Sequence, residues 1–262
     1  MLDPKDFEAL DRPKITDMLF YPRPQWSPAP PGAYDHMVEV GSDVSVSCRF
    51  YLSGRNAPTI LFFHGNGEVT ADYDSIAPLY LQLGINLFVA DYRGYGASGG
   101  TPSYTSMLAD ADVIHGYLTE VLESDGFSGR LFVMGRSLGA ASALILAANY
   151  PEGIAGLVLE SGAANPHRLL SRLGADADRD ELARIEAARS AILQGVKVPL
   201  LVIHGEMDAL IPLEDAQRLH EEVAAPQKDL VVIPDAGHND IMSVGIDLYF
   251  WAIEEFVLGL AS

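Results

Sequence analysis

From Pro58 onward, short runs of apolar residues alternate with longer segments of helical character. Apolar runs without polar interruptions are typical of strands that are covered on both faces. These runs span residues 59–63, 85–90, 130–134, 154–159, 199–203 and 229–233, and the helical segments span residues 73–83, 105–123, 138–150, 213–223 and 240–260. Regular alternation of strand and helix predicts an α/β fold, with a mostly parallel central sheet and helices on both faces.

The residues before this alternation have a different character. Residues 1–34 are rich in proline, and we expect them to form an extended arm over the domain surface. Residues 36–40 and 44–52 alternate between apolar and polar side chains on either side of a Gly-Ser-Asp turn, which predicts an antiparallel hairpin at the edge of the sheet. A chain of 262 residues can bury the core of one large α/β domain, so we expect a single domain over residues 1–262.

One interval interrupts the alternation. Residues 164–197 are too long for a simple connection between two strands. Within them Leu182, Ile185, Ala188 and Ile192 recur at helical spacing. We therefore expect a short helical cap insertion whose apolar face lies over the rim of a substrate pocket. The alternative is that this helix packs on a flanking helix, away from substrate.

The charge balance restricts the classes of partner. The chain has 17 Lys and Arg against 36 Asp and Glu, a net charge of −19. An acidic surface repels nucleic acid and anionic membranes, so we expect no nucleic-acid partner. No apolar run reaches membrane-spanning length, and the first residues lack the pattern of a signal peptide. These features, together with the single cysteine Cys48, predict a cytoplasmic protein without a disulfide or a membrane span.

The segment from Gly135 to Gly139 has the pattern Gly-x-Ser-x-Gly, with Ser137 at its centre. A predicted strand precedes the segment and a predicted apolar helix follows it. In that context the pattern predicts a nucleophile elbow, a tight turn that exposes a serine above the end of a strand. The turn requires residues without side chains beside the serine, which the two glycines provide. Ser137 is therefore the candidate nucleophile.

Two later loops supply a candidate acid and a candidate base. Asp208 follows the strand predicted at residues 199–203, and His238 follows the last predicted strand. An acid that accepts a hydrogen bond from the imidazole fixes its tautomer, and Ser, Asp, His is an order along the chain in which such triads occur. Glu160, at the end of the strand at 154–159, is a rival for the acid.

An acyl-transfer site also needs two N–H groups that point at the developing oxyanion. One is expected from Leu138, the residue after the nucleophile. The other is expected from the glycine-rich loop that follows the first parallel strand, most simply from Asn66. His64 precedes this loop, and we interpret it as a structural residue that braces the loop rather than as a second base.

A second glycine-rich pattern is set aside. Gly94, Gly96 and Gly99 match the spacing of a dinucleotide-binding turn, but Thr101-Pro102-Ser103 follows where a helix would have to begin. No His or Cys spacing typical of a metal site is present. We therefore expect neither cofactor nor metal.

In combination, these motifs resemble the α/β-hydrolase superfamily and are most similar to its Bem46-like group, which is related to the ABHD hydrolases. The resemblance is carried by His64-Gly65-Asn66-Gly67, Asp91-Tyr92-Arg93-Gly94-Tyr95-Gly96, the elbow at 135–139, the segment from His204 to Asp208, and Gly237-His238-Asn239-Asp240. It implies an ester, thioester or lipid-acyl substrate, and it implies that the segment at 91–96 is a structural turn.

The sequence therefore predicts a serine hydrolase that cleaves carboxylic ester or thioester bonds of a small or lipid-like acyl substrate. Two alternatives remain open. The same triad could pass the acyl group to another acceptor, as an acyltransferase does, or the chain could be a non-catalytic relative that only binds ligand.

Overall fold

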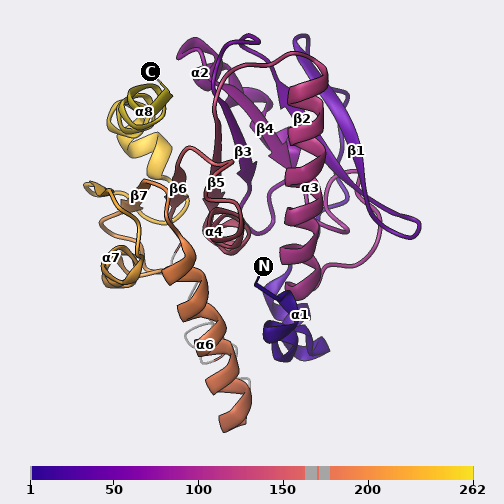
Figure 1. Ribbon diagram of the computed structural model, residues 1–262, viewed down its shortest axis with the longest axis vertical. Helices are drawn as coiled ribbons and strands as arrows, with labels where there is room; N and C mark the ends of the chain where they lie inside the picture. The colour runs from indigo at the N-terminus through magenta and orange to yellow at the C-terminus, as the bar shows by residue number, and fades with distance from the viewer. Residues whose placement is uncertain (1, 163–169, 171–177, 262) are drawn as a thin grey trace.

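The computed structural model describes residues 2–162, 170 and 178–261 (Figure 1). The described strands form one eight-stranded sheet in the order β1-β2-β4-β3-β5-β6-β7-β8. β2 is antiparallel to both of its neighbours, β1 and β4, and all other neighbouring strands are parallel. The strands are β1 (Ala33–Gly41), β2 (Val44–Tyr51), β3 (Thr59–Phe63), β4 (Asn86–Ala90), β5 (Leu131–Arg136), β6 (Leu157–Glu160), β7 (Leu200–Gly205) and β8 (Lys228–Ile233).

Helices cover both faces of the sheet (Figure 1). One face carries α3 (Tyr104–Ser124), α4 (Ala140–Asn149), α6 (Arg179–Gly195) and α7 (Leu213–Glu222). The other face carries α2 (Ala77–Gln82) and α8 (Ile241–Ala261), and the short 3-10 turn η2 (Thr70–Ser75) precedes α2.

Because successive side chains of a strand point to opposite faces, a strand between two helical layers must be apolar throughout. In β3, Leu61 and Phe63 belong to the first layer's core, while Ile60 and Phe62 belong to the second. The predicted α/β fold with a mostly parallel sheet and an antiparallel edge hairpin is thereby confirmed. β3 has the predicted bounds, and β6 begins at Leu157, three residues later than predicted, where pairing with Val133 starts.

The N-terminal segment differs from the extended arm expected over residues 1–34. It begins with the 3-10 helix η1 (Pro4–Asp11) and continues with α1 (Pro13–Leu19). Asp3 starts η1 by accepting a hydrogen bond from the Lys5 N–H, and proline stands at the first turn of both helices, where its missing N–H is not needed. Apolar side chains of both helices are buried, namely Phe7, Leu10, Ile15 and Leu19. Residues 20–32 have neither helix nor strand, as the proline content indicated.

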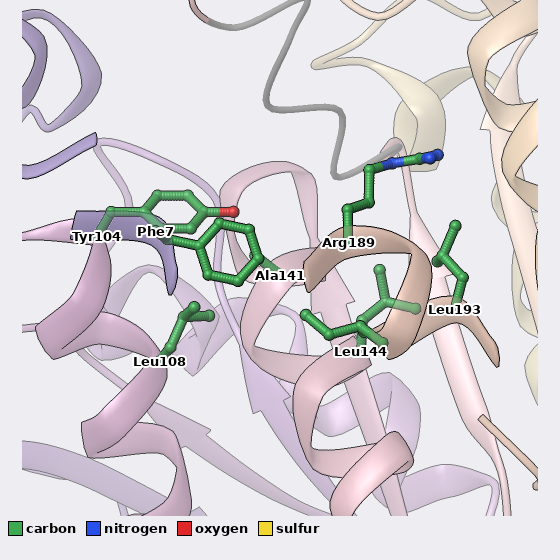
Figure 2. A pocket seen from close by; sticks show the side chains of 8 residues that line it. Phe7, Tyr104, Leu108, Ala141, Leu144, Arg189 and Leu193 are labelled. Atoms are coloured by element: carbon green, nitrogen blue, oxygen red, sulfur yellow. The ribbon is translucent and has the colours of Figure 1, made fainter. Parts of the chain in front are cut away.

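The expected cap insertion at residues 164–197 contains α6, while residues 164–169 and 171–177 lie outside the described residues. The apolar face of α6, expected at a pocket rim, packs instead on α4 and η1, which is the alternative that the sequence left open. Figure 2 shows this junction, which holds a small cavity lined by Arg189 and Leu193 of α6 and by Phe7, Ala141 and Leu144. The cavity between them is only about 20 Å³, room for about one water molecule, so no acyl chain fits there.

Shortening a buried side chain of α6 should therefore reduce stability rather than alter substrate preference. Ile185 is fully buried, and Ile185→Ala is expected to lower the free energy of unfolding by about 2–5 kcal/mol, because it leaves a cavity in a packed junction. Urea denaturation measures this loss, with Ser190→Ala on the exposed side of the same helix as control. A changed acyl-chain preference at unchanged stability would show that α6 is a lid.

Among the described residues, no helix combines the length and the apolar character needed to cross a membrane.

Candidate active site

The predicted nucleophile lies on a strained turn between β5 and α4. Ser137 begins the short turn η3 (Ser137–Gly139) with a φ of 51°, a left-handed conformation that costs free energy for a residue with a side chain. The neighbouring glycines make the turn possible. A Cβ atom on Gly135 would clash with the Gly139 carbonyl, and one on Gly139 would clash with the Phe63 carbonyl. This is the geometry of a nucleophile elbow.

The three side chains predicted as a triad come from three separate strand ends and lie in contact. The Ser137 Oγ is 3.0 Å from Nε2 of His238, and Nδ1 of the same imidazole is 2.7 Å from Oδ2 of Asp208. The carboxylate can only accept, so it selects the tautomer that carries its proton on Nδ1. Nε2 is then free to accept the proton of the serine hydroxyl.

The surroundings of Asp208 favour its ionised form. Its Oδ1 accepts hydrogen bonds from the N–H groups of Leu210 and Ile211, at 2.9 Å and 2.7 Å. Burial acts to raise the pKa of the Asp208 carboxyl, but the hydrogen bonds from His238 and the Ile211 N–H outweigh burial, and the pKa is lowered. The carboxylate therefore stays charged beside the imidazole at neutral pH.

The rival acid, Glu160, is used elsewhere. Its Oε1 accepts a hydrogen bond from Nε of Arg136 at 3.0 Å, and its Oε2 accepts one from the Tyr249 hydroxyl at 2.8 Å. Burial raises the pKa of Glu160, while the Arg136 guanidinium lowers it. Glu160 does lie at the end of β6, as predicted, but the Glu160 carboxylate binds Arg136 rather than His238.

The glycine-rich loop after β3 is held to the N-terminal segment through the side chain of Asn66. The Asn66 Oδ1 accepts hydrogen bonds from the Tyr21 N–H at 2.9 Å and from the Tyr95 hydroxyl at 2.7 Å. Its Nδ2 donates to the Leu19 carbonyl at 2.8 Å. These contacts fix the direction of the Asn66 side chain, and the backbone N–H of Asn66 is the predicted oxyanion donor of this loop. Leu138, the other predicted donor, follows Ser137 in η3.

His64 braces this loop, as the sequence indicated. It is fully buried, with Nδ1 2.8 Å from the Gly65 carbonyl oxygen and Nε2 3.1 Å from Oδ1 of Asp91. The Tyr92 hydroxyl donates to the His64 carbonyl at 2.6 Å. Both ring nitrogens thus face groups of the scaffold.

Two charged side chains beside the site, Arg136 and Glu68, were not predicted from the sequence. Arg136, the residue before the nucleophile, is buried and contacts Glu68 of the glycine-rich loop as well as Glu160. The signal was present, since Arg136 is a charged residue at the end of an otherwise apolar strand, directly before a predicted active-site serine.

The described residues contain no group of three or more His, Cys, Asp or Glu side chains arranged to hold a metal ion. The glycine-rich segment at 94–99 closes on itself, because the Gly94 N–H donates to the Gly99 carbonyl at 3.0 Å, and the next helix, α3, begins only at Tyr104.

Comparisons with known proteins identify relatives of this chain. A family model described as "Serine aminopeptidase, S33" matches residues 54–185. An uncharacterised protein of Mycobacterium tuberculosis is 32% identical over 230 residues, which cover 84% of this chain and 77% of the relative. The protein bem46 of Schizosaccharomyces pombe is 29% identical over 209 residues, which cover 78% of this chain and 69% of the relative.

A solved structure extends the likeness to the whole fold. The esterase Pf2001 of Pyrococcus furiosus superposes with a TM-score of 0.72 at 19% identity, over 92% of this chain and 100% of that chain. At that identity the superposition establishes the shared architecture. The sheet order, the elbow at Ser137 and the sequence matches together show that this chain belongs to the α/β-hydrolase superfamily, in its Bem46-like group.

Proposed function

We propose that this hydrolase cleaves carboxylic ester or thioester bonds through an acyl-enzyme formed on Ser137. The observation that carries the proposal is the unbroken line of hydrogen bonds from the Ser137 hydroxyl through His238 to Asp208. A serine hydroxyl is a weak nucleophile unless an adjacent base removes its proton, and this line supplies both the base and the group that orients it.

The reaction would proceed in two steps. Ser137 Oγ attacks the acyl carbonyl while Nε2 of His238 takes its proton and then protonates the leaving alcohol or thiol. The N–H groups of Leu138 and Asn66 hold the oxyanion of each tetrahedral intermediate. Water then loses a proton to His238 and attacks the acyl-enzyme, which releases the acid and restores Ser137. Asp208 stays ionised and stabilises the imidazolium in both steps.

Apolar side chains near the site favour a substrate with an apolar acyl part. Met207 and Leu210, on either side of Asp208 in sequence, are 66% and 50% exposed. Tyr21, whose N–H binds the Asn66 side chain, is 69% exposed. Large apolar side chains left exposed around a catalytic centre are typical of surfaces that receive an apolar ligand.

A nitrophenyl ester series with acyl chains of two to twelve carbons tests the proposal. We expect a pre-steady-state burst of nitrophenol approaching one equivalent per active site, because activated nitrophenyl esters acylate the serine faster than water hydrolyses the acyl-enzyme. Acyl-thioesters should also be cleaved, and aminoacyl amides, included because of the family model's description, should be cleaved more slowly. Acyl transfer to added alcohols in preference to water would favour the acyltransferase alternative. Absence of turnover with every ester and thioester would contradict the proposal.

A further inference from the structure

Arg136 occupies an unusual position for a charged residue. It is the last residue of β5 and directly precedes Ser137, and its side chain is only 9% exposed. Burial of a guanidinium is unfavourable unless its N–H groups find acceptors. Burial acts to lower the pKa of Arg136, but Glu160 and Glu68 outweigh it, so the pKa is raised and the charge is retained.

The guanidinium of Arg136 reaches both segments that would complete the catalytic centre. Nη1 forms an ion pair with Glu68, and Nη2 donates to the main-chain carbonyl of His238 at 3.1 Å and to Oδ1 of Asn239 at 3.1 Å. Nε donates to Glu160, which anchors the group to β6. One planar side chain thus holds the loop of the base and the glycine-rich loop in a fixed relation to the nucleophile.

Arg136 contacts the glycine-rich loop in two ways, through Glu68 and through the loop backbone at Gly65. The second oxygen of Glu68 accepts a hydrogen bond from the Gly65 N–H at 2.8 Å, one residue before Asn66. The Tyr73 hydroxyl donates to the same oxygen at 2.7 Å. A Cβ atom on Gly65 would clash with Nη1 of Arg136, so the loop backbone lies against the guanidinium itself.

The opposite side of the network is fixed deep in the second helical layer. The Glu160 Oε2 accepts from the Tyr249 hydroxyl, which is 3.0 Å from the Tyr80 hydroxyl. Glu160, Tyr249 and Tyr80 are all at most 1% exposed. Because Glu160 is held in the packed core, Arg136 is fixed relative to the sheet. It can therefore hold the glycine-rich loop and the loop that carries His238 in place.

We infer that Arg136 is a positioning residue, whose fork of donors sets the distance of the His238 imidazole and of the Asn66 N–H from the Ser137 Oγ. This inference rests on the proposed function. An arginine is needed because four separate acceptors surround one plane, whereas a lysine offers a single point of charge. Arg136 would act by positioning the His238 imidazole and the Asn66 N–H, not by contacting substrate. Its loss should therefore lower kcat rather than weaken substrate binding.

The test compares Arg136→Lys with Arg49→Lys. Arg49 is a matched control, because it is also buried, binds two carboxylates and one main-chain carbonyl, and lies on β2, three strands from the elbow. Arg136→Lys is expected to lower kcat on nitrophenyl esters, and the rate constant of labelling by a fluorophosphonate, by about 10²-fold, since a misplacement of about 1 Å has an effect of that size. KM should change less than about threefold. Arg49→Lys should lower the melting temperature with kcat within about threefold of the wild type.

Two further variants keep the inference testable if Arg136→Lys does not fold. Glu68→Gln retains an acceptor for the Gly65 N–H but removes the ion pair, and Asn239→Ala removes one acceptor of Nη2. Each should lower kcat roughly tenfold with KM unchanged, and where Arg136→Lys folds, adding Glu68→Gln to it should have little further effect, because both act through one network.

The failures of the two proposals are distinguishable. A wild-type protein that is not labelled at Ser137 would overturn the proposed function. Wild-type labelling at Ser137, together with a folded Arg136→Lys that loses no more kcat than Arg49→Lys, would overturn only the role of Arg136; so would unchanged kcat in both Glu68→Gln and Asn239→Ala.

Discussion

Ser137→Ala is expected to lower kcat on esters by on the order of 10⁶-fold and to abolish covalent labelling by a fluorophosphonate. The size of the loss follows from the proposed mechanism, in which removing the nucleophile eliminates the acyl-enzyme and leaves only the contribution of the oxyanion donors and of binding. The fold should be retained, because alanine has the same Cβ atom as serine, so the cost of the left-handed φ is unchanged and no bulk is added to the turn.

Ser142→Ala is the matched control for this result. Ser142 lies on α4, close to the nucleophile in sequence, and is fully buried, with an Oγ that has no hydrogen-bond partner among the described residues. Removal of an unsatisfied hydroxyl is close to neutral for stability, and labelling should be unchanged. Peptide mapping that finds the label on any serine other than Ser137 would overturn the assignment of the nucleophile.

Asp208→Asn is expected to lower kcat by about 10⁴-fold, because an amide no longer fixes the tautomer of His238 or stabilises the imidazolium. Glu160→Gln should cost far less, since Glu160 contacts Arg136 and Tyr249 instead of the imidazole. Steady-state kinetics of the two folded variants decide between the acids, and equal losses would mean that Asp208 is not the orienting acid.

The same variant should also change the pH dependence of stability. The pKa of Asp208 is lowered in the folded protein, so its charge stabilises the fold above the usual carboxyl pKa of about 3.9, and this contribution is lost as the pH falls through the lower, folded value. Asp208→Asn is therefore expected to be less stable than the wild type at pH 7, with the difference shrinking on acidification below about pH 4.

The parts of this structure that follow from local chemistry could be predicted from the sequence. The continuous apolar run that forms β3 can be buried on both faces only between two helical layers. The glycines at 135 and 139 indicate a turn that is too tight for side chains. Strand ends of a parallel sheet meet at one edge, so residues as distant as Ser137, Asp208 and His238 could be expected there together.

What could not be predicted depends on partners that only the folded chain brings together. The prolines in the first 34 residues indicated an extended arm. However, Phe7 and Leu10 of η1 pack against α3 and α6, and this burial stabilises the 3-10 helix. The apolar face at Ile185 was visible in the sequence, but the identity of the surface that covers it was not. Glu160 was correctly placed at a strand end, and only its contact with Arg136 shows which way the carboxylate points.

The hydrogen bonds of the Asn66 side chain to Leu19 and Tyr21 tie the glycine-rich loop of the candidate active site to residues that precede the sheet. The stretch from residue 54 to 185 that the family model matches contains the nucleophile and the glycine-rich loop. Transplanted into another hydrolase, that stretch would leave behind the acid, the base and the N-terminal residues that hold the loop. During synthesis the candidate site is complete only after the loop that carries His238 has left the ribosome.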